Sequence, residues 1–373
     1  MSDILARQMP PVQYAQTGGV KMAYYEVGPR EGVPVIFCHG FPELAFSWRH
    51  QLRAFEAAGR WAIAPDQRGY GLTERPGPVE AYDIENLTAD MVGLLDHLGV
   101  EKAVFCGHDW GGIVVWQMPL RHPDRTAGVI GLNTPFMARA PADPIAIMRH
   151  RMGDEMYIVH FQKPGEADAV LNGDVAKAMN FFLRRPIVGE AQPSAGLATE
   201  RKPGEADAVL DGDVAKAMNF FMRRPILGET PPSAGLATER KPGDPSAFAL
   251  INILKAYDPA FDPRERFLSD DEFAAFVETF ERTGFTGGIN WYRNFTRNWE
   301  RSANIVEKVS CPSLMVMAEN DAVLPPSAAD GMEAYVTDLE KTLIKESGHW
   351  TQQEKPEAVN AVILDWMDRR FPK

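Results

Sequence analysis

The chain has 373 residues, and 45% of them are apolar, which is enough to bury a large core in one domain or in one domain with an insertion. The formal net charge of −12, with scattered Lys and Arg residues, argues against a nucleic-acid surface or an anionic membrane surface. Residues 1–17 lack the apolar segment of a signal peptide, and no run of about eighteen apolar residues predicts a membrane span. Cys38, Cys106 and Cys311 lie in or beside apolar runs, so we expect buried, reduced thiols in a cytoplasmic protein.

Strand and helix patterns alternate over residues 1–136. Residues 20–27, 33–38, 61–65 and 128–132 read as strands, and the run 33–38 is apolar throughout, as in a strand buried on both faces. A turn follows at 39–43, where a cis peptide before Pro42 would suit the tight bend. An amphipathic helix before Gly99 is predicted by the spacing of Leu87, Met91, Leu94, Leu95 and Leu98.

The segment Gly107-His108-Asp109-Trp110-Gly111 follows an apolar strand at 103–106 and opens a helix at 113–120, which Pro119 and Pro123 should bend and end. This is the strand, sharp turn and helix of a nucleophile elbow, with a carboxylate in place of serine. The flanking glycines suit a strained turn. A carboxylate in that position is suited to attack a saturated carbon that bears a leaving group, forming an alkyl ester.

This alternation predicts a mostly parallel sheet with helices on both faces and a site at the carboxyl ends of the strands. From 137 to 303 the pattern contains helices and loops only. Strands resume at 313–318 and 343–344, and a helix at 357–371 closes the chain. We therefore predict a core domain of residues 1–136 and 304–373, interrupted by a helical cap, or lid, of residues 137–303.

The predicted cap contains a tandem duplication. Residues 163–201 recur as 202–240 with a 39-residue offset and five differences, at Asn172/Asp211, Leu183/Met222, Val188/Leu227, Ala191/Thr230 and Gln192/Pro231. Each copy predicts one amphipathic helix, over 173–185 and 212–224. Only one copy can occupy a given site under the cap, so the other has to find a new place, pair with a second chain in a homodimer, or remain unpacked.

A carboxylate nucleophile needs three kinds of helper. His349 follows the last strand and is the candidate base that would activate water for ester hydrolysis. Asp321, in preference to Glu319, would orient that imidazole, because the acid is expected just past the end of the preceding strand. The backbone N–H groups of Phe41 and Trp110 would form an oxyanion hole.

Two cap tyrosines, Tyr157 and Tyr292, would donate to an oxygen that becomes an alkoxide, as an epoxide oxygen does when its ring opens. We predict a substrate pocket lined by Phe41, Trp110, Phe136 and Trp350. No metal and no cofactor are expected. The spacing of His39, His108 and His160 does not suit metal ligands, and satisfied polar contacts near turns are the simpler interpretation.

Several motifs together resemble those of the α/β-hydrolase-fold epoxide hydrolases, in particular the soluble type. They are His39-Gly-Phe-Pro-Glu43, Gly107-His-Asp-Trp-Gly-Gly112, Tyr157 with Phe161-Gln-x-Pro-Gly165, Asn290-Trp-Tyr-Arg-Asn294, Glu319-Asn-Asp-Ala-Val-Leu324 and Gly348-His-Trp-Thr-Gln352. The resemblance covers nearly the whole chain. It implies hydrolysis of a small apolar epoxide by water, with Asp109 as nucleophile, His349 as base, Asp321 as its partner, and Tyr157 and Tyr292 as donors to the epoxide oxygen.

Two alternatives use the same elbow. A haloalkane or haloacid dehalogenase would share the Asp-His-Asp triad, although Phe41 stands where haloalkane dehalogenases usually carry Asn, and Trp110 where fluoroacetate dehalogenases carry Arg. A catalytically impaired binding module would result if the duplication remodels the cap between the two tyrosines.

Overall fold

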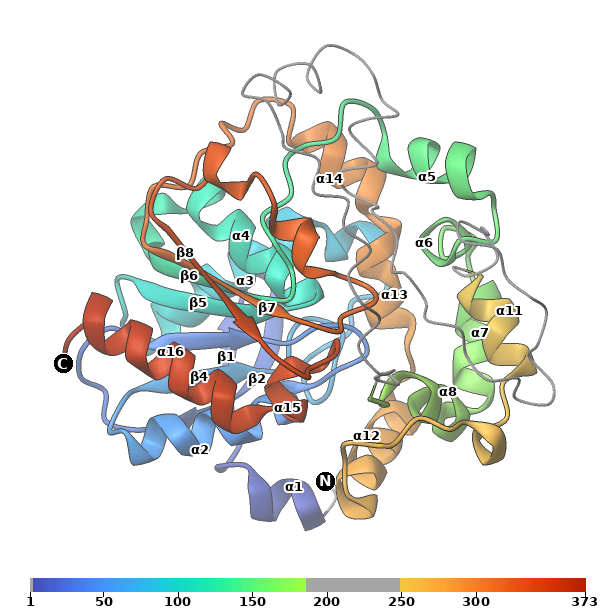
Figure 1. Cartoon of the computed structure of the whole chain (residues 1–373), viewed down its shortest axis with the longest axis horizontal. Helices are drawn as coiled ribbons and strands as arrows, with labels where there is room; N and C mark the ends of the chain where they lie inside the picture. Colours follow the sequence, from blue (N-terminus) through green and yellow to red (C-terminus); the bar gives the residue numbers. More distant parts are fainter. Residues whose placement is uncertain (1–2, 186–248) are drawn as a thin grey trace.

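The computed structural model describes residues 3–185 and 249–373, and its centre is an eight-stranded sheet (Figure 1). The strand order is β1-β2-β4-β3-β5-β6-β7-β8, in which β1 and β2 are antiparallel to their neighbours and the remaining pairs are parallel. The strands are β1 Gln13–Thr17, β2 Val20–Val27, β3 Val35–Cys38, β4 Ala62–Pro65, β5 Ala103–His108, β6 Thr126–Leu132, β7 Ser313–Ala318 and β8 Leu339–Ile344. Strands β3, β4 and β5 are buried along their whole length, which explains the continuous apolar sequence of β3, of β4 and of the first four residues of β5.

Helices cover both faces of the sheet (Figure 1). Helices α2 (Arg49–Ala57) and α16 (Pro356–Arg370) lie together on one face, and α3 (Ile84–Leu98) and α4 (Trp110–Arg121) on the other. Local signals set the bounds of α3, because the Asp83 side chain accepts from the Asn86 N–H at its start and Gly99 adopts φ 69° at its end. The predicted α/β-hydrolase architecture is confirmed.

The predicted strands coincide with observed ones, apart from two omissions. The short strand β1 and the first residues of β8 escaped prediction, because both carry polar side chains and are only partly buried at the sheet edges. The peptide bond between Phe41 and Pro42 is cis, as the turn suggested. Cys38 and Cys106 are buried free thiols, whereas Cys311 is half-buried.

Between β6 and β7 the described chain forms helices that lie beyond one end of the sheet, on the right of Figure 1. They are α5 Pro144–Met152, α6 Tyr157–His160, α7 Glu166–Gly173, α8 Val175–Phe182, α11 Leu250–Ala256, α12 Asp270–Thr283, α13 Thr286–Arg293 and α14 Phe295–Arg301. Helix α13 lies against the core, since the Trp291 Nε1–H donates to the Arg68 carbonyl at 3.1 Å and the Asn294 amide donates to the Val79 carbonyl at 2.7 Å. These contacts fix the helix that carries Tyr292 directly over the ends of the strands.

The first repeat copy is described from residue 163 to residue 185, and the second copy, 202–240, lies outside the described residues. The helix predicted over 173–185 is present as the shorter α8, whereas α7, which precedes it in the same copy, was not predicted. The two helices are separated at Asp174, whose side chain accepts from the Lys177 N–H and so begins α8. The segment packs well, because Leu171, Met179 and Leu183 are fully buried.

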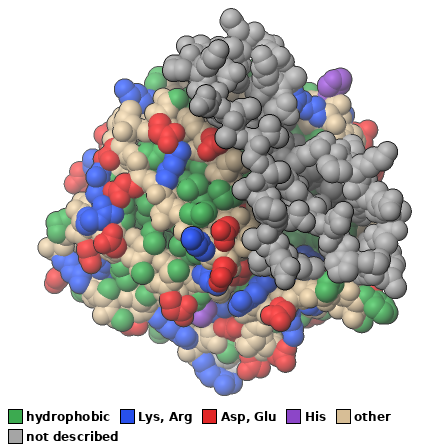
Figure 2. Space-filling view, viewed as in Figure 1, with side chains coloured by type: hydrophobic (Ala, Val, Ile, Leu, Met, Phe, Trp, Pro, Cys, Tyr) green, Lys and Arg blue, Asp and Glu red, His purple; other side chains and the backbone are tan. Residues whose placement is uncertain are grey.

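The visible surface intersperses Lys and Arg side chains with Asp and Glu side chains, without a single-sign patch on its described part (Figure 2). Within residues 3–185 and 249–373, no helix has the length and apolar character that crossing a membrane requires.

Candidate active site

Asp109 stands between β5 and α4 in a backbone conformation of φ 51° and ψ −120°, which non-glycine residues rarely adopt. Its neighbours must be glycines: a Cβ on Gly107 would lie 2.2 Å from the Gly111 carbonyl oxygen, and one on Gly111 would lie 2.0 Å from the Cys38 carbonyl oxygen. The Thr134 hydroxyl donates to the Asp109 carbonyl at 2.8 Å. The turn thereby presents the carboxylate at the carboxyl end of the central strand.

One backbone N–H group donates to this carboxylate, and a second directly follows Asp109 at the start of α4. The Phe41 N–H donates to Asp109 Oδ1 at 2.8 Å. Trp110 opens α4, and the helical hydrogen bonds begin with the Ile113 N–H donating to the Asp109 carbonyl, so the Trp110 N–H has no partner within the helix. Gly40 is required beside them, because a Cβ there would lie 2.4 Å from the Asp109 Cβ.

His349 lies between two carboxylates. Its Nδ1 is 2.9 Å from Asp321 Oδ2, and its Nε2 is 3.7 Å from Asp109 Oδ2. The other oxygen of Asp321 accepts from the backbone N–H groups of Val323 and Leu324, at 2.8 and 2.9 Å. Asp321 is therefore fixed by its own loop and presents its remaining oxygen to the imidazole.

Burial and the neighbouring charges shift the pKa values of Asp321 and His349 strongly. Burial raises the pKa of Asp321, but the neighbouring His349 and the hydrogen bonds lower it more, to about 2. Burial lowers the pKa of His349, but Asp321 and Asp109 raise it more, so that it lies well above the ordinary value. The side chains of Asp109 and His349 remain 16% and 14% exposed, so solvent reaches both groups.

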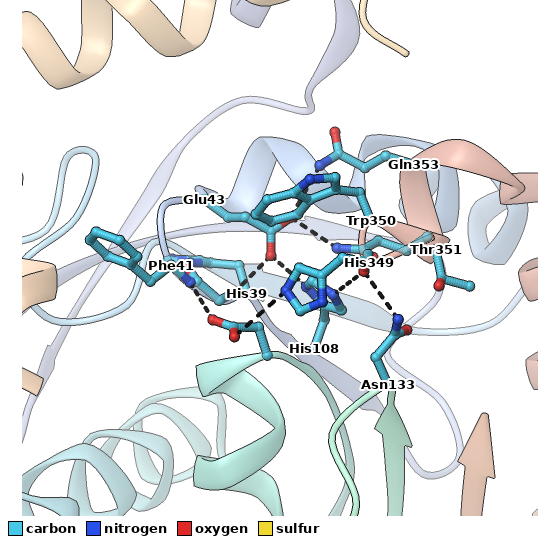
Figure 3. A network of polar contacts seen from close by, with 12 residues as sticks. His39, Phe41, Glu43, His108, Asn133, His349, Trp350, Thr351 and Gln353 are labelled. Atoms are coloured by element: carbon cyan, nitrogen blue, oxygen red, sulfur yellow. Dashed lines mark hydrogen bonds and ion pairs between the residues drawn. The ribbon is translucent and has the colours of Figure 1, made fainter. Parts of the chain in front are cut away.

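A second buried contact between a histidine and a carboxylate, which the sequence did not reveal, supports the His349 backbone (Figure 3). His108 Nε2 lies 2.6 Å from the His349 carbonyl oxygen, and its Nδ1 lies 2.7 Å from Glu43 Oε2. Both ring nitrogens of His108 thus face oxygen atoms. The side-chain amides of Gln352 and Gln353 donate to the other Glu43 oxygen, at 2.9 and 3.1 Å. Only the His39-to-Glu43 motif hinted at Glu43.

The structure brings both predicted cap tyrosines to the nucleophile. The rings of Tyr157 and Tyr292 are 5.8 Å apart, and the Tyr292 ring lies 5.1 Å from Trp110 and 5.4 Å from Phe41. Burial, followed by the charge of Asp109, raises the pKa of both phenols above the ordinary value of 10. Both groups therefore stay protonated at neutral pH and can donate.

Polar contacts within the cap hold the two tyrosine-bearing helices together. The Gln162 Nε2–H₂ group donates to the Ile158 carbonyl in α6 and to the Tyr292 carbonyl in α13, both at 2.9 Å. Arg293, next to Tyr292, pairs with Asp168 in α7 at 2.6 Å. Because Asp168 belongs to the first repeat copy, that copy takes part in placing the tyrosines.

Aromatic rings surround the nucleophile. Phe41 makes edge contacts with the rings of Phe161, Phe182, Phe285 and Tyr292, at 5.4 to 6.2 Å between ring centroids. Trp350 packs on the ring of His349 at 4.9 Å. Phe136 instead packs against Trp116 and Tyr335, so its place in the substrate pocket stays a prediction. Phe161, Phe182 and Phe285 were not predicted, because single phenylalanines in the cap carry no distinguishing pattern.

Comparison with known proteins identifies this arrangement. Residues 33–170 match the family model described as alpha/beta hydrolase fold. The chain is 40% identical over 361 residues to epoxide hydrolase A of Mycobacterium tuberculosis, covering 96% of this chain and 97% of that protein. It is 35% identical over 352 residues to bifunctional epoxide hydrolase 2 of Sus scrofa, covering 94% of this chain and 54% of the longer pig protein.

Solved structures agree with these relatives. The crystal structure of epoxide hydrolase A from Mycobacterium thermoresistibile superposes with a TM-score of 0.75 at 35% identity, covering 97% of this chain and 99% of that one. The crystal structure of epoxide hydrolase VrEH1 from Vigna radiata superposes with a TM-score of 0.73 at 29% identity, covering 97% of this chain and 98% of that one. The chain therefore belongs to the epoxide hydrolases of the α/β-hydrolase fold, enzymes that hydrolyse epoxides to diols.

Proposed function

We propose that Asp109 opens the epoxide as a nucleophile. One carboxylate oxygen attacks a ring carbon, the bond from that carbon to the epoxide oxygen breaks, and the electron pair stays on the oxygen. Tyr157 and Tyr292 donate hydrogen bonds to this oxygen, and a phenol proton passes to it, so that the product is a hydroxyalkyl ester of Asp109. The observation that supports this role is a carboxylate in a nucleophile elbow that faces two protonated phenols.

In the second half-reaction, His349 removes a proton from water, and the hydroxide attacks the ester carbonyl of Asp109. The N–H groups of Phe41 and Trp110 stabilise the oxyanion. Collapse of the tetrahedral intermediate expels the diol oxygen, which takes the proton from His349, and Asp109 returns as a carboxylate. The proton left on the new carboxyl group of Asp109 passes through water to the phenolate, so that both groups return to their starting states.

Charge explains how His349 can change its role between the two steps. In the free enzyme, the carboxylates of Asp321 and Asp109 together hold the pKa of His349 high. Alkylation converts Asp109 into a neutral ester and removes one of these two charges. The pKa of His349 then falls, its proton passes to solvent, and the neutral imidazole becomes a base at the stage that needs one; it regains the proton from solvent when Asp109 returns as a carboxylate.

The substitution His349→Gln tests these assignments directly. Alkylation should proceed, whereas ester hydrolysis should stall, so styrene oxide is expected to leave a covalent adduct whose mass equals that of the epoxide on the peptide that contains Asp109. The matched variant Asp109→Ala should form no adduct. An adduct on another residue, or diol formation by His349→Gln at the rate of the unaltered enzyme, would contradict the proposal.

The aromatic surroundings of Asp109 favour an apolar epoxide, because the rings offer few hydrogen-bond partners beyond the two phenols. Comparing styrene oxide with a fatty-acid epoxide and with glycidol tests this preference. We expect the polar glycidol to have the lowest kcat/KM, and equal values for all three would contradict an apolar pocket.

The division into a core of residues 1–136 and 304–373 and a cap of residues 137–303, the homodimer and the cytoplasmic location are likewise our proposals. The duplicated segment offers a second apolar stripe for pairing between chains. If it serves a homodimer, deleting residues 202–240 should change the oligomeric state in solution. An unchanged state after the deletion would exclude that role.

A further inference from the structure

Glu354 holds the backbone on both sides of His349. Its Oε2 accepts from the Gly348 N–H at 2.9 Å, and its Oε1 accepts from the Trp350 N–H at 2.9 Å. The residue is 7% exposed and ends the short helix α15 (Thr351–Glu354), so its carboxylate reaches back across one helical turn. One buried carboxylate thereby bridges the two amides that flank His349.

Other groups hold the carbonyls of the same segment. The Asn133 amide donates to the carbonyls of Gly348 and His349, both at 3.2 Å, and the Thr351 hydroxyl donates to Gly348 at 2.8 Å. Figure 3 shows Asn133 and His108 approaching the His349 backbone. The carbonyls of Gly348 and His349 thus have their own donors, and Glu354 supplies the acceptor for the N–H groups of Gly348 and Trp350.

We propose that Glu354 is a positioning residue for the second half-reaction, and this inference rests on the proposed roles of Asp109 and His349. His349 has to keep its 2.9 Å contact with Asp321 while its Nε2 stays close to the ester that forms on Asp109. A displacement of about 1 Å at such a group can lower a rate by about a hundredfold. Two charge-assisted hydrogen bonds from neighbouring amides limit the displacement of the intervening residue.

The first half-reaction does not depend on this segment in the same way. The Asp109 carboxylate takes its hydrogen bond from Phe41, and the tyrosines are held by Gln162 and by the cap. A change at Glu354 should therefore slow ester hydrolysis much more than alkylation. A helix cap with only a structural role would lower stability without separating the two steps.

The substitution Glu354→Gln replaces one acceptor oxygen with an NH₂ group, which would face an amide N–H. We expect ester hydrolysis to slow about tenfold or more and alkylation to change less than about threefold, so that the alkyl-enzyme accumulates during turnover. Rapid-quench measurements with styrene oxide, followed by intact-protein mass spectrometry, give both rates. The exposed Glu357, in the first turn of α16, provides the control Glu357→Gln, which should leave both rates unchanged.

The shorter carboxylate of Glu354→Asp should give the same selective slowing, and it carries the test if Glu354→Gln does not fold. Parallel losses in both steps, or unchanged hydrolysis in a folded variant, would overturn the positioning role. A different result would contradict the proposed function itself, namely that His349→Gln forms no alkyl-enzyme.

Discussion

Replacing either cap tyrosine with phenylalanine should slow the first half-reaction specifically. The change removes one phenol that donates to the developing alkoxide and keeps the ring contacts of Tyr157 and Tyr292. A hydrogen bond to a charged group is worth about 1.5–3 kcal/mol, which corresponds to about a 10- to 100-fold loss of the alkylation rate. The two rings lie 5.8 Å apart, and burial together with the Asp109 charge raises the pKa of both phenols. We therefore expect comparable losses of the alkylation rate for the two single variants.

The double variant should lose about 10²- to 10⁴-fold, since both donors to one oxygen are then missing. The His349→Gln background isolates alkylation, and adduct formation in a single turnover gives its rate. Trp110, whose ring lies 5.1 Å from Tyr292, offers a fluorescence signal for the same step. Tyr257→Phe is the matched control, because Tyr257 is a buried cap tyrosine whose hydroxyl donates to Asp262 at 2.9 Å.

Single variants that alkylate at the rate of the unaltered enzyme would refute the assignment of the tyrosines. A loss confined to ester hydrolysis would refute it as well, because the phenols would then serve the second step.

Four further predictions concern the triad, the elbow and the duplication. Asp321→Asn should slow ester hydrolysis roughly 10²- to 10⁴-fold in the pre-steady state, because His349 loses its orienting partner. The pKa of Asp321 is about 2, against an ordinary 3.8, so the ionised carboxylate contributes about 2 kcal/mol of stability above roughly pH 4. This contribution is lost as the pH falls through 2. Urea titrations at different pH values should therefore show this dependence for the unaltered enzyme and not for Asp321→Asn. Gly40→Ala should abolish adduct formation, because the new Cβ would displace Asp109, and normal alkylation would contradict that contact. Deleting residues 202–240 should change kcat/KM less than about threefold, because residues of the first copy already pack in the cap and pair with Arg293 beside Tyr292. An inactive deletion variant would contradict this.

The sequence predicted most of the fold because buried parallel strands leave continuous apolar runs. The residues of β3 and β7 illustrate this, since each is apolar or small over its length. The helix predicted over 173–185 corresponds to α8, but α7 was missed, and the Asp174 side chain that caps α8 separates the two helices.

The residues of the proposed mechanism could be predicted because strand ends and motif spacing constrain Asp109, Asp321 and His349. Glu43 and Glu354 could not, because a buried carboxylate that accepts backbone N–H groups has no sequence pattern that distinguishes it from a surface carboxylate. Their contacts join residues far apart in the chain, such as Glu43 with His108, or depend on the path of one turn, as for Glu354.

The most direct test of the covalent route is one turnover in ¹⁸O-water with enzyme in excess over styrene oxide. Attack of water on the Asp109 ester carbonyl should leave ¹⁸O in the Asp109 carboxylate, and the first diol should contain only the unlabelled oxygens of the epoxide and of the original carboxylate. Mass spectrometry of the peptide and of the diol measures both. Label in the first-turnover diol with an unlabelled Asp109 would mean that water attacks the epoxide directly, and would contradict the central claim.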